Sequence, residues 1–179
     1  MEEKKISGEV VFSGRLIKVE SDRVKLSDGV EATREVVHHP GAVAIMAITA
    51  EDELVLVSQF RYATGETLLE LPAGVPAKGE SGEEAARREL TEETGYLAAH
   101  IQKLWEGYSS PGYSDEKIAF FMASGLTRAA QRPDEDERIE VELVDMAACL
   151  ELARSGTIKD SKTLIGIQLA GLWQRGEWE

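Results

Sequence analysis

The sequence predicts an α+β fold, in which short strands are combined with a few separate helices. Three observations lead to this prediction. Short apolar or β-branched runs bounded by turn residues occupy most of the first 71 residues. A capped, charge-rich helix is indicated at residues 82–94. Near the carboxyl end, apolar residues recur at helical spacing in 146–154 and 162–175.

Length and composition limit the class of protein. With 179 residues, 42% of them hydrophobic, the chain is long enough for one ordinary domain, or one domain and a small extra piece. Its formal charge of −13 disfavours binding to nucleic acid and to anionic membrane surfaces. Cys149 is the only cysteine, which excludes an intrachain disulfide and a cysteine metal site. No apolar run approaches the ~20 residues of a membrane span, so we expect a cytoplasmic protein.

The amino-terminal segment is expected to form a small antiparallel sheet. Its strand-like runs, separated by turn residues, are 10–12, 16–19 and 24–26. Such a sheet has too little apolar area to be stable alone. His39-Pro40-Gly41 marks a break in the pattern, which predicts two domains, 1–39 and 40–179.

The second domain begins with two β-rich runs, 42–48 and 54–59, which predict a central hairpin. Further strand-like runs are 68–71, 104–108, 117–122 and 139–144. Loops are expected at Pro111-Gly112 and at the acid run 132–137. The mixture of strands and isolated helices indicates helices that cover the faces of a mixed sheet.

The helix at 82–94 has clear local signals at both ends. Ser81 with Glu84 three residues later is a capping box, and Gly95 is a typical stop. Within the helix, Glu89, Glu92 and Glu93 stand at i, i+3 and i+4, so their carboxylates share one face.

A solvated face with salt bridges is the simplest interpretation of these charges, and Glu84, Arg88 and Glu92 fit it at i,i+4 spacing. Glu89 has no cation at the helical neighbour positions, and Glu93 lies in the last turn, where the helix dipole disfavours an acid. A bound cation removes this conflict. Oxygen ligands alone favour Mg²⁺, or Mn²⁺.

The segment GVPAKGESGEEAARRELTEETGY, from Gly74 to Tyr96, resembles the Nudix box. Only Tyr96 departs, because the pattern prefers a bulky aliphatic residue there. The resemblance implies the Nudix α/β/α sandwich and a hydrolase of nucleoside diphosphates linked to another group. It also implies metal ligation by Glu89, Glu93 and the carbonyl of Ala73, with Glu92 supporting a further metal. Arg88 would orient these glutamates.

Three further features resemble the ADP-ribose pyrophosphatases of this family. They are the run Glu70 to Gly74, Gln59-Phe60-Arg61, and a proline fifteen residues past Tyr96, Pro111. The resemblance implies a homodimer that exchanges the amino-terminal β domain. It implies that Arg61 contacts the diphosphate and that Arg34 and Glu35 help to recognise adenine.

The resemblance also implies a general base on a loop, and the matching acid run is 133–137. We choose Glu135, with Glu137 second, by register against the following strand. The expected reaction is Mg²⁺-dependent hydrolysis of ADP-ribose to AMP and ribose 5-phosphate. Two alternatives are another nucleoside diphosphate sugar, such as GDP-mannose, and a nucleotide-sensing Nudix module without catalysis. A damaged glutamate set or an attached DNA-binding segment would mark such a module, and the sequence has neither.

Overall fold

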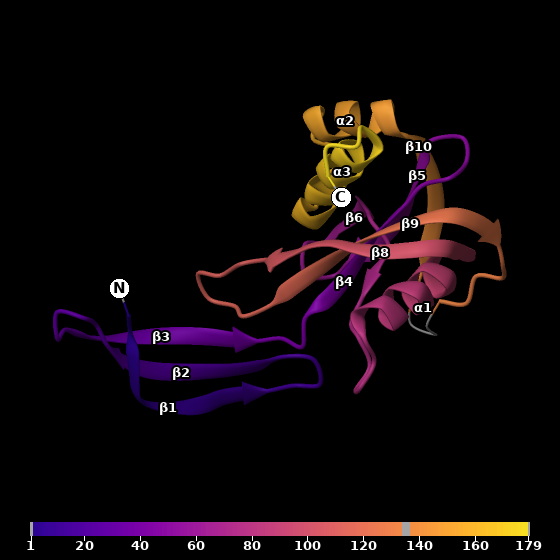
Figure 1. Cartoon of the computed structure of the whole chain (residues 1–179). Helices are drawn as coiled ribbons and strands as arrows, with labels where there is room; N and C mark the ends of the chain where they lie inside the picture. The colour runs from indigo at the N-terminus through magenta and orange to yellow at the C-terminus, as the bar shows by residue number, and fades with distance from the viewer. Residues whose placement is uncertain (1, 134–136, 179) are drawn as a thin grey trace. The chain divides into compact units, whose positions relative to one another are not determined.

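A computed structural model describes residues 2–133 and 137–178. The chain separates into two compact units, each described here by itself (Figure 1). One unit comprises Met1–Gly41 and Gly107–Ile118, and the other comprises Ala42–Glu106 and Ala119–Glu179. Within the described residues, no helix combines the length and the apolar character that crossing a membrane requires.

The first unit is built on a three-stranded antiparallel sheet in the order β1-β2-β3, which confirms the predicted small sheet. Its strands are β1 (Lys4–Ser13), β2 (Lys18–Lys25) and β3 (Glu31–His38). The two short strands predicted within 16–26 form the single strand β2. Residues 20–23, which are polar, continue it because they pair with β1 on one side and β3 on the other.

The second unit contains two sheets. The first has the strand order β7-β4-β9-β8. Its strands are β7 (Ala73–Gly74), β4 (Ala42–Ala47), β9 (Lys117–Arg128) and β8 (Tyr96–Tyr108). The last residues of β8 and the first residues of β9 belong to the first unit. The second, in the order β10-β5-β6, consists of β10 (Ile139–Asp145), β5 (Glu53–Arg61) and β6 (Glu66–Glu70).

The predicted central hairpin of β4 and β5 is wrong. A tight turn joins the two strands, and they share the bridge between Ile48 and Leu54, but they then belong to different sheets. β4 is buried along most of its length, and β5 is buried in its first half, from Leu54 to Val57. An apolar strand of this kind can pair with a different strand on each of its edges. The pattern of apolar residues within the strand does not indicate which strands those are.

All three helices of the described chain lie where the sequence predicts them. They are α1 (Gly82–Thr94), α2 (Met146–Arg154) and α3 (Ser161–Gln174). The capping box of Ser81 and Glu84 is present, and Gly95 closes α1 in the left-handed conformation, φ 68°. Aspartates cap the other two helices, Asp145 for α2 and Asp160 for α3.

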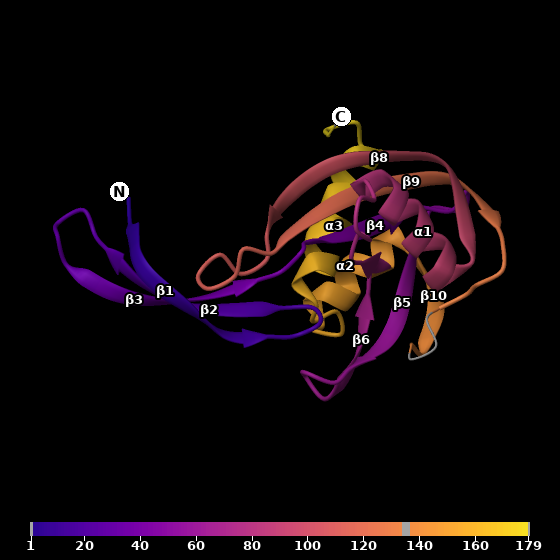
Figure 2. The same ribbon diagram turned by 90° about the horizontal axis from the view of Figure 1, so that it is seen from below.

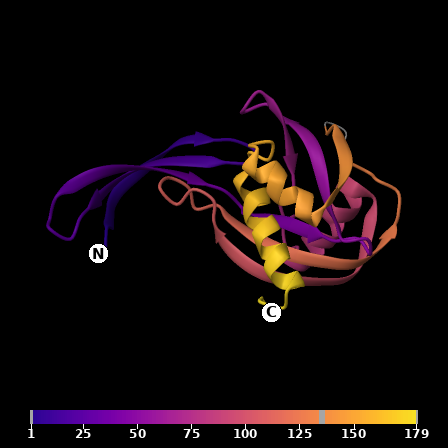
Figure 3. The ribbon, with the colours of Figure 1, turned by 90° about the horizontal axis from the view of Figure 1, so that it is seen from above.

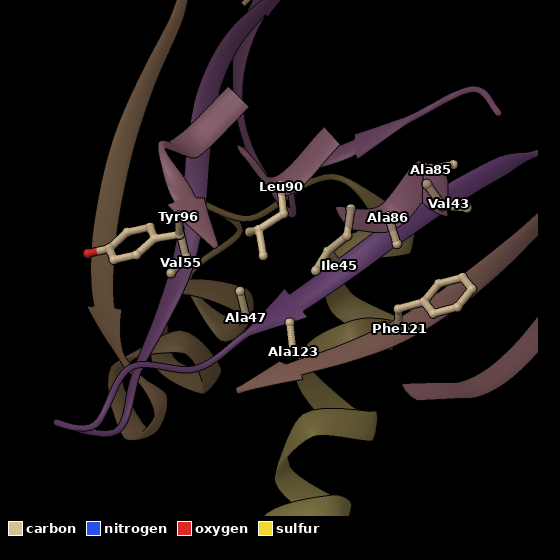
Figure 4. Close-up of a cluster of buried hydrophobic side chains, with 10 residues drawn as sticks. All are labelled: Val43, Ile45, Ala47, Val55, Ala85, Ala86, Leu90, Tyr96, Phe121 and Ala123. Carbon is tan, nitrogen blue, oxygen red and sulfur yellow. The ribbon is translucent and has the colours of Figure 1, made fainter. Parts of the chain in front are cut away.

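Helices cover both sides of β4, which gives an α/β/α arrangement. The view from below has α1 toward the reader, and the view from above has α2 and α3 toward the reader (Figures 2 and 3). Alternate β4 side chains, such as Ile45, pack with Ala86 and Leu90 of α1 (Figure 4). On the other face Met46 approaches Gly166 of α3. This packing fixes α1, the helix that carries the glutamates.

Candidate active site

The short strand β7 meets the glutamate face of α1. Its residues Ala73 and Gly74 pair with β4, and the N–H of Ala73 donates to Oε2 of Glu93 over 3.1 Å. A Cβ at position 74 would lie 2.0 Å from Oε1 of Glu89, so only glycine leaves room for this carboxylate. The structure thus brings together Ala73, Glu89 and Glu93.

Burial perturbs both carboxylates. Glu93 is 3% exposed, and this burial raises its pKa from 4.5 to about 8, although the N–H of Ala73 opposes the shift. The negative charges of Glu89 and Glu137 raise it further. Burial also raises the pKa of Glu89, against the guanidinium of Arg88. Two neighbouring acids with pKa values raised by burial, Glu93 fully and Glu89 partly buried, are typical of a functional site.

Arg88 connects three glutamates. It donates to both oxygens of Glu80 at 2.9 Å, to Glu89 at 2.8 Å and to Glu92 at 2.9 Å. The expectation that Glu89 lacks a cation is therefore wrong, because the long guanidinium side chain reaches its own chain neighbour. The expected pair of Arg88 with Glu84 is also absent from the described contacts, since Glu84 accepts from Ser81 in the capping box.

The acid run follows a segment that is attached to the end of α1. The side chain of Gln131 donates to the carbonyl of Glu93 over 2.6 Å, and the N–H of Arg132 donates to the carbonyl of Glu92 over 2.9 Å. Glu137 lies close enough to raise the pKa of Glu89 and of Glu93. Glu135, the first choice for the general base, lies outside the described residues.

Arg61, at the end of β5, forms an ion pair with Glu70, a residue that the sequence analysis did not assign to the site. Its Nε and Nη2 donate to Oε1 and Oε2 of Glu70, at 2.7 and 2.8 Å. Glu93 lies near enough for its charge to raise the pKa of Arg61. Glu70 also accepts from Lys162, on α3. The sequence run from Glu70 to Gly74 resembles the ADP-ribose pyrophosphatases and could have identified Glu70 as a site residue. No motif near Lys162 in the sequence indicates its contact with Glu70.

The remaining predicted residues belong to the first unit. Arg34, on β3, forms an ion pair with Glu3 at 2.7 Å, and Glu35 beside it is exposed. Pro111 is exposed in the turn closed by the N–H of Tyr113, which donates to the carbonyl of Ser110 over 3.1 Å. The structure does not place these three residues relative to the carboxylates of α1.

A hollow of the second unit lies elsewhere. Its volume is about 750 Å³, and its wall includes Thr49, Asp52, Met146 and Trp173. None of the predicted site residues lines it. Chemistry, rather than the size of a hollow, therefore assigns the site to the carboxylate face of α1.

Comparison with known proteins agrees with this geometry. The model of the NUDIX domain matches residues 38–164, a range that contains α1 and the strands around it. The chain belongs to the Nudix family. Its sandwich of sheets between helices is accordingly the Nudix fold.

Two relatives match nearly the whole chain, and others match about 70% of it. It is 42% identical to the ADP-ribose pyrophosphatase of Bacillus subtilis (strain 168), over 94% of this chain and 92% of the relative. It is 41% identical to the methanol dehydrogenase activator of Bacillus methanolicus, over 93% and 91%. Relatives named GDP-mannose pyrophosphatase match over 70% of the chain, at 38% identity for that of Salmonella arizonae.

A solved structure also matches, that of an ADP compounds hydrolase. Its TM-score is 0.88, with 26% sequence identity, and the match covers 99% of this chain and 96% of the other. The two folds therefore agree over almost their full length.

Nudix hydrolases depend on a divalent metal, and the donors on α1 fit such an ion. Glu93 is buried beside a second acid, and a cation would relieve their repulsion. Within the described residues, no three acidic, histidine or cysteine side chains form a metal site by themselves. The ion would need the carbonyl of Ala73, water and substrate oxygens as well, which is the pattern that Mg²⁺ prefers.

We predict that the metal-free Glu93→Gln variant is more stable than the metal-free wild type, and that the difference in the free energy of unfolding grows as the pH rises. The folded state holds the proton of Glu93 to about pH 8, whereas the unfolded chain releases it near 4.5. Wild type therefore loses stability between these pH values through this group, and the variant does not. We expect a difference on the order of 2–4 kcal/mol at pH 8 in urea unfolding with a chelator.

Two controls accompany this prediction. Saturating Mg²⁺ should stabilise wild type and remove the difference, while Glu93→Gln should have no turnover. Glu92→Gln, which removes only the ion pair to Arg88, should change stability by less than about 1 kcal/mol. Equal stability of wild type and Glu93→Gln at pH 8 without metal would contradict the prediction.

Proposed function

We propose that this chain hydrolyses ADP-ribose to AMP and ribose 5-phosphate, with Mg²⁺, or Mn²⁺, as its metal. The observation that carries the proposal is the pair of glutamates, Glu93 buried and Glu89 partly buried, held against the main chain of Ala73 and Gly74. The names of relatives, ADP-ribose pyrophosphatase and ADP compounds hydrolase, support the substrate.

The metal would neutralise charge on the diphosphate and lower the pKa of a water. Glu89, Glu93 and the carbonyl of Ala73 hold it in this proposal, and Glu92 supports a further ion. Arg88 keeps the carboxylates of Glu89 and Glu92 in place through its hydrogen bonds to both. These residues thus act together as a rigid set of oxygen donors.

Substrate recognition requires positive charge on a chain whose formal charge is −13. Arg61 contacts the diphosphate in this proposal, because its guanidinium lies near Glu93 and remains partly exposed. Arg34 and Glu35 recognise adenine, and the loop at Pro111 contacts the substrate.

We expect ADP-ribose to be the preferred substrate. In a steady-state assay with Mg²⁺, kcat/KM for ADP-ribose should exceed that for GDP-mannose at least about tenfold, a difference of ~1.4 kcal/mol in transition-state binding. Chromatography should identify AMP and ribose 5-phosphate as the products. The reverse ratio would favour the GDP-mannose alternative, and binding of ADP-ribose without turnover would favour a sensing module.

The general base in this proposal is a carboxylate of the acid run. Glu137 raises the pKa of Glu89 and of Glu93, so the end of this run repels the metal-binding acids when no cation is present. Bound metal reverses the sign of the local charge and attracts the run.

We predict that Glu135→Gln lowers kcat by ~10²–10⁴ with little change in KM, the size of a lost general base. Glu140→Gln, an exposed acid on β10, is the matched control and should leave both constants unchanged. Loss of activity in Glu137→Gln but not in Glu135→Gln would identify Glu137, rather than Glu135, as the general base in this run. Full activity in both would place the base on α1.

We also propose that the active protein is a homodimer formed through the amino-terminal sheet. All ten residues of β1 are exposed, including Ile6, Val10, Val11 and Phe12. Within the described sheet, the strands bury only Asp22 and Val24. A three-stranded sheet with so little core needs another surface to cover it, and we assign that surface to a second copy of this chain.

We expect sedimentation velocity to give about twice the 19.6 kDa of one chain. Val11→Glu adds a charge to the exposed apolar strand, so it should shift the protein toward the monomer while circular dichroism retains the sheet signal. A soluble, fully active monomer after deletion of residues 1–39 would refute the dimer.

A further inference from the structure

Glu70, at the end of β6, is a buried carboxylate with two cationic partners. Its side chain is 2% exposed, and it receives Arg61 from β5 and Lys162 from α3. Burial opposes its ionisation, but these two cations hold its pKa below the usual value. A buried carboxylate requires such pairing, because an unpaired charge inside a protein is strongly destabilising.

The geometry leaves one edge of Arg61 available. Nε and Nη2 form a two-bond fork with the carboxylate of Glu70. Across the described residues, Nη1 forms no hydrogen bond, and the side chain of Arg61 is 38% exposed. Glu70 thus fixes the plane of the guanidinium, and Nη1 is the group left to donate to an anion.

A salt-bridged arginine alone is a weak anion binder, because Glu70 cancels its charge. Lys162 shares the same Oε2 of Glu70, so the charge of this carboxylate is divided between two cations and offsets less of the charge of Arg61. The nearby Asp160 accepts from Lys162 at 3.0 Å, but it also accepts from the N–H and hydroxyl of Thr163 at the start of α3. The positive end of the helix dipole therefore offsets part of its charge.

The same helix start supports the neighbouring main chain. The hydroxyl of Thr163 accepts from the N–H of Leu71 over 2.8 Å, and Leu71 follows Glu70 directly. Lys162 therefore acts on a carboxylate whose backbone is already fixed. Loss of Lys162 would therefore change the charge and the orientation of the Arg61 side chain more than the backbone conformation at Glu70 and Leu71.

We propose that Lys162 is a positioning residue for substrate binding, which acts through Glu70 to orient Arg61 and to keep it electropositive toward the diphosphate. This proposal rests on the proposed function, in which Arg61 contacts the diphosphate. Lys162 itself contacts neither the substrate nor the metal.

Lys162→Met tests the proposal in the full-length protein, since it removes the charge and keeps an unbranched side chain. We expect KM for ADP-ribose, and Kd for its non-hydrolysable α,β-methylene analogue in calorimetry, to rise about tenfold, with kcat within about twofold of wild type. Lys162→Arg, which keeps the charge, should restore most of the affinity. If Lys162→Met does not fold, Lys162→Gln takes its place with the same expectation.

Lys159→Met is the matched control. Lys159 lies three residues earlier and pairs with Glu66 of the same strand β6, but both side chains are at least half exposed. We expect this variant to keep the wild-type KM and kcat. A change equal to that of Lys162→Met would mean that any loss of positive charge in this region weakens binding, which would overturn the specific role of Lys162.

A double-mutant cycle separates positioning from direct contact. In the background of Arg61→Ala, Lys162→Met should add less than about twofold to KM, because its effect passes through Arg61. Additive effects would show that Lys162 touches the substrate itself, and an unchanged KM with a lower Tm would show a structural role alone. Either result overturns the proposal. Absence of turnover in wild type would instead refute the proposed function, whatever Lys162→Met does to binding.

Discussion

The structure depends on holding two acidic side chains, the buried Glu93 and the partly buried Glu89, against the main chain of Ala73 and Gly74. The carboxylate of Glu89 lies over Gly74, where a Cβ would meet it, and that of Glu93 accepts from the N–H of Ala73. β7 must pair with β4 to bring this stretch there, and α1 must pack on β4 to face it. In the proposed reaction the sandwich is therefore the support that holds these two acids in place for a cation.

The charges around this pair are divided between two roles. Arg88 donates hydrogen bonds to Glu89 and Glu92 of α1. Glu93 instead accepts a hydrogen bond from the N–H of Ala73. Arg61 lies at the end of another strand and is stabilised by Glu70. Arg88 thus orders the acids, whereas Arg61 is the arginine that binds the anion in the proposed reaction. A chain with 33 acidic and 20 basic residues needs this separation, because its average field repels the anionic substrate of the proposed reaction.

The sequence predicted those parts of the molecule that local signals determine. The ends of α1 follow from Ser81, Glu84 and Gly95, and the structure confirms both of them. The pairing of β4 and β5 was predicted wrongly, because strand partners depend on contacts between distant segments. The link of Glu70 to Lys162 spans 92 residues, and no local pattern indicates such a contact. The pairing of Arg88 with Glu89 was missed because helical spacing rules ignore the reach of a long side chain.

The divergence of β4 and β5 has a consequence for how the molecule opens. Because the two strands enter different sheets, α1 packs on both, and Leu90 shares one cluster with Val43 of β4 and Val55 of β5. A helix held by two sheets has no independent route to unfolding, so its amide protons should exchange with solvent only when the whole second unit unfolds. The acids of α1 therefore belong to the most cooperative part of the protein, and thermal fraying does not release them one at a time.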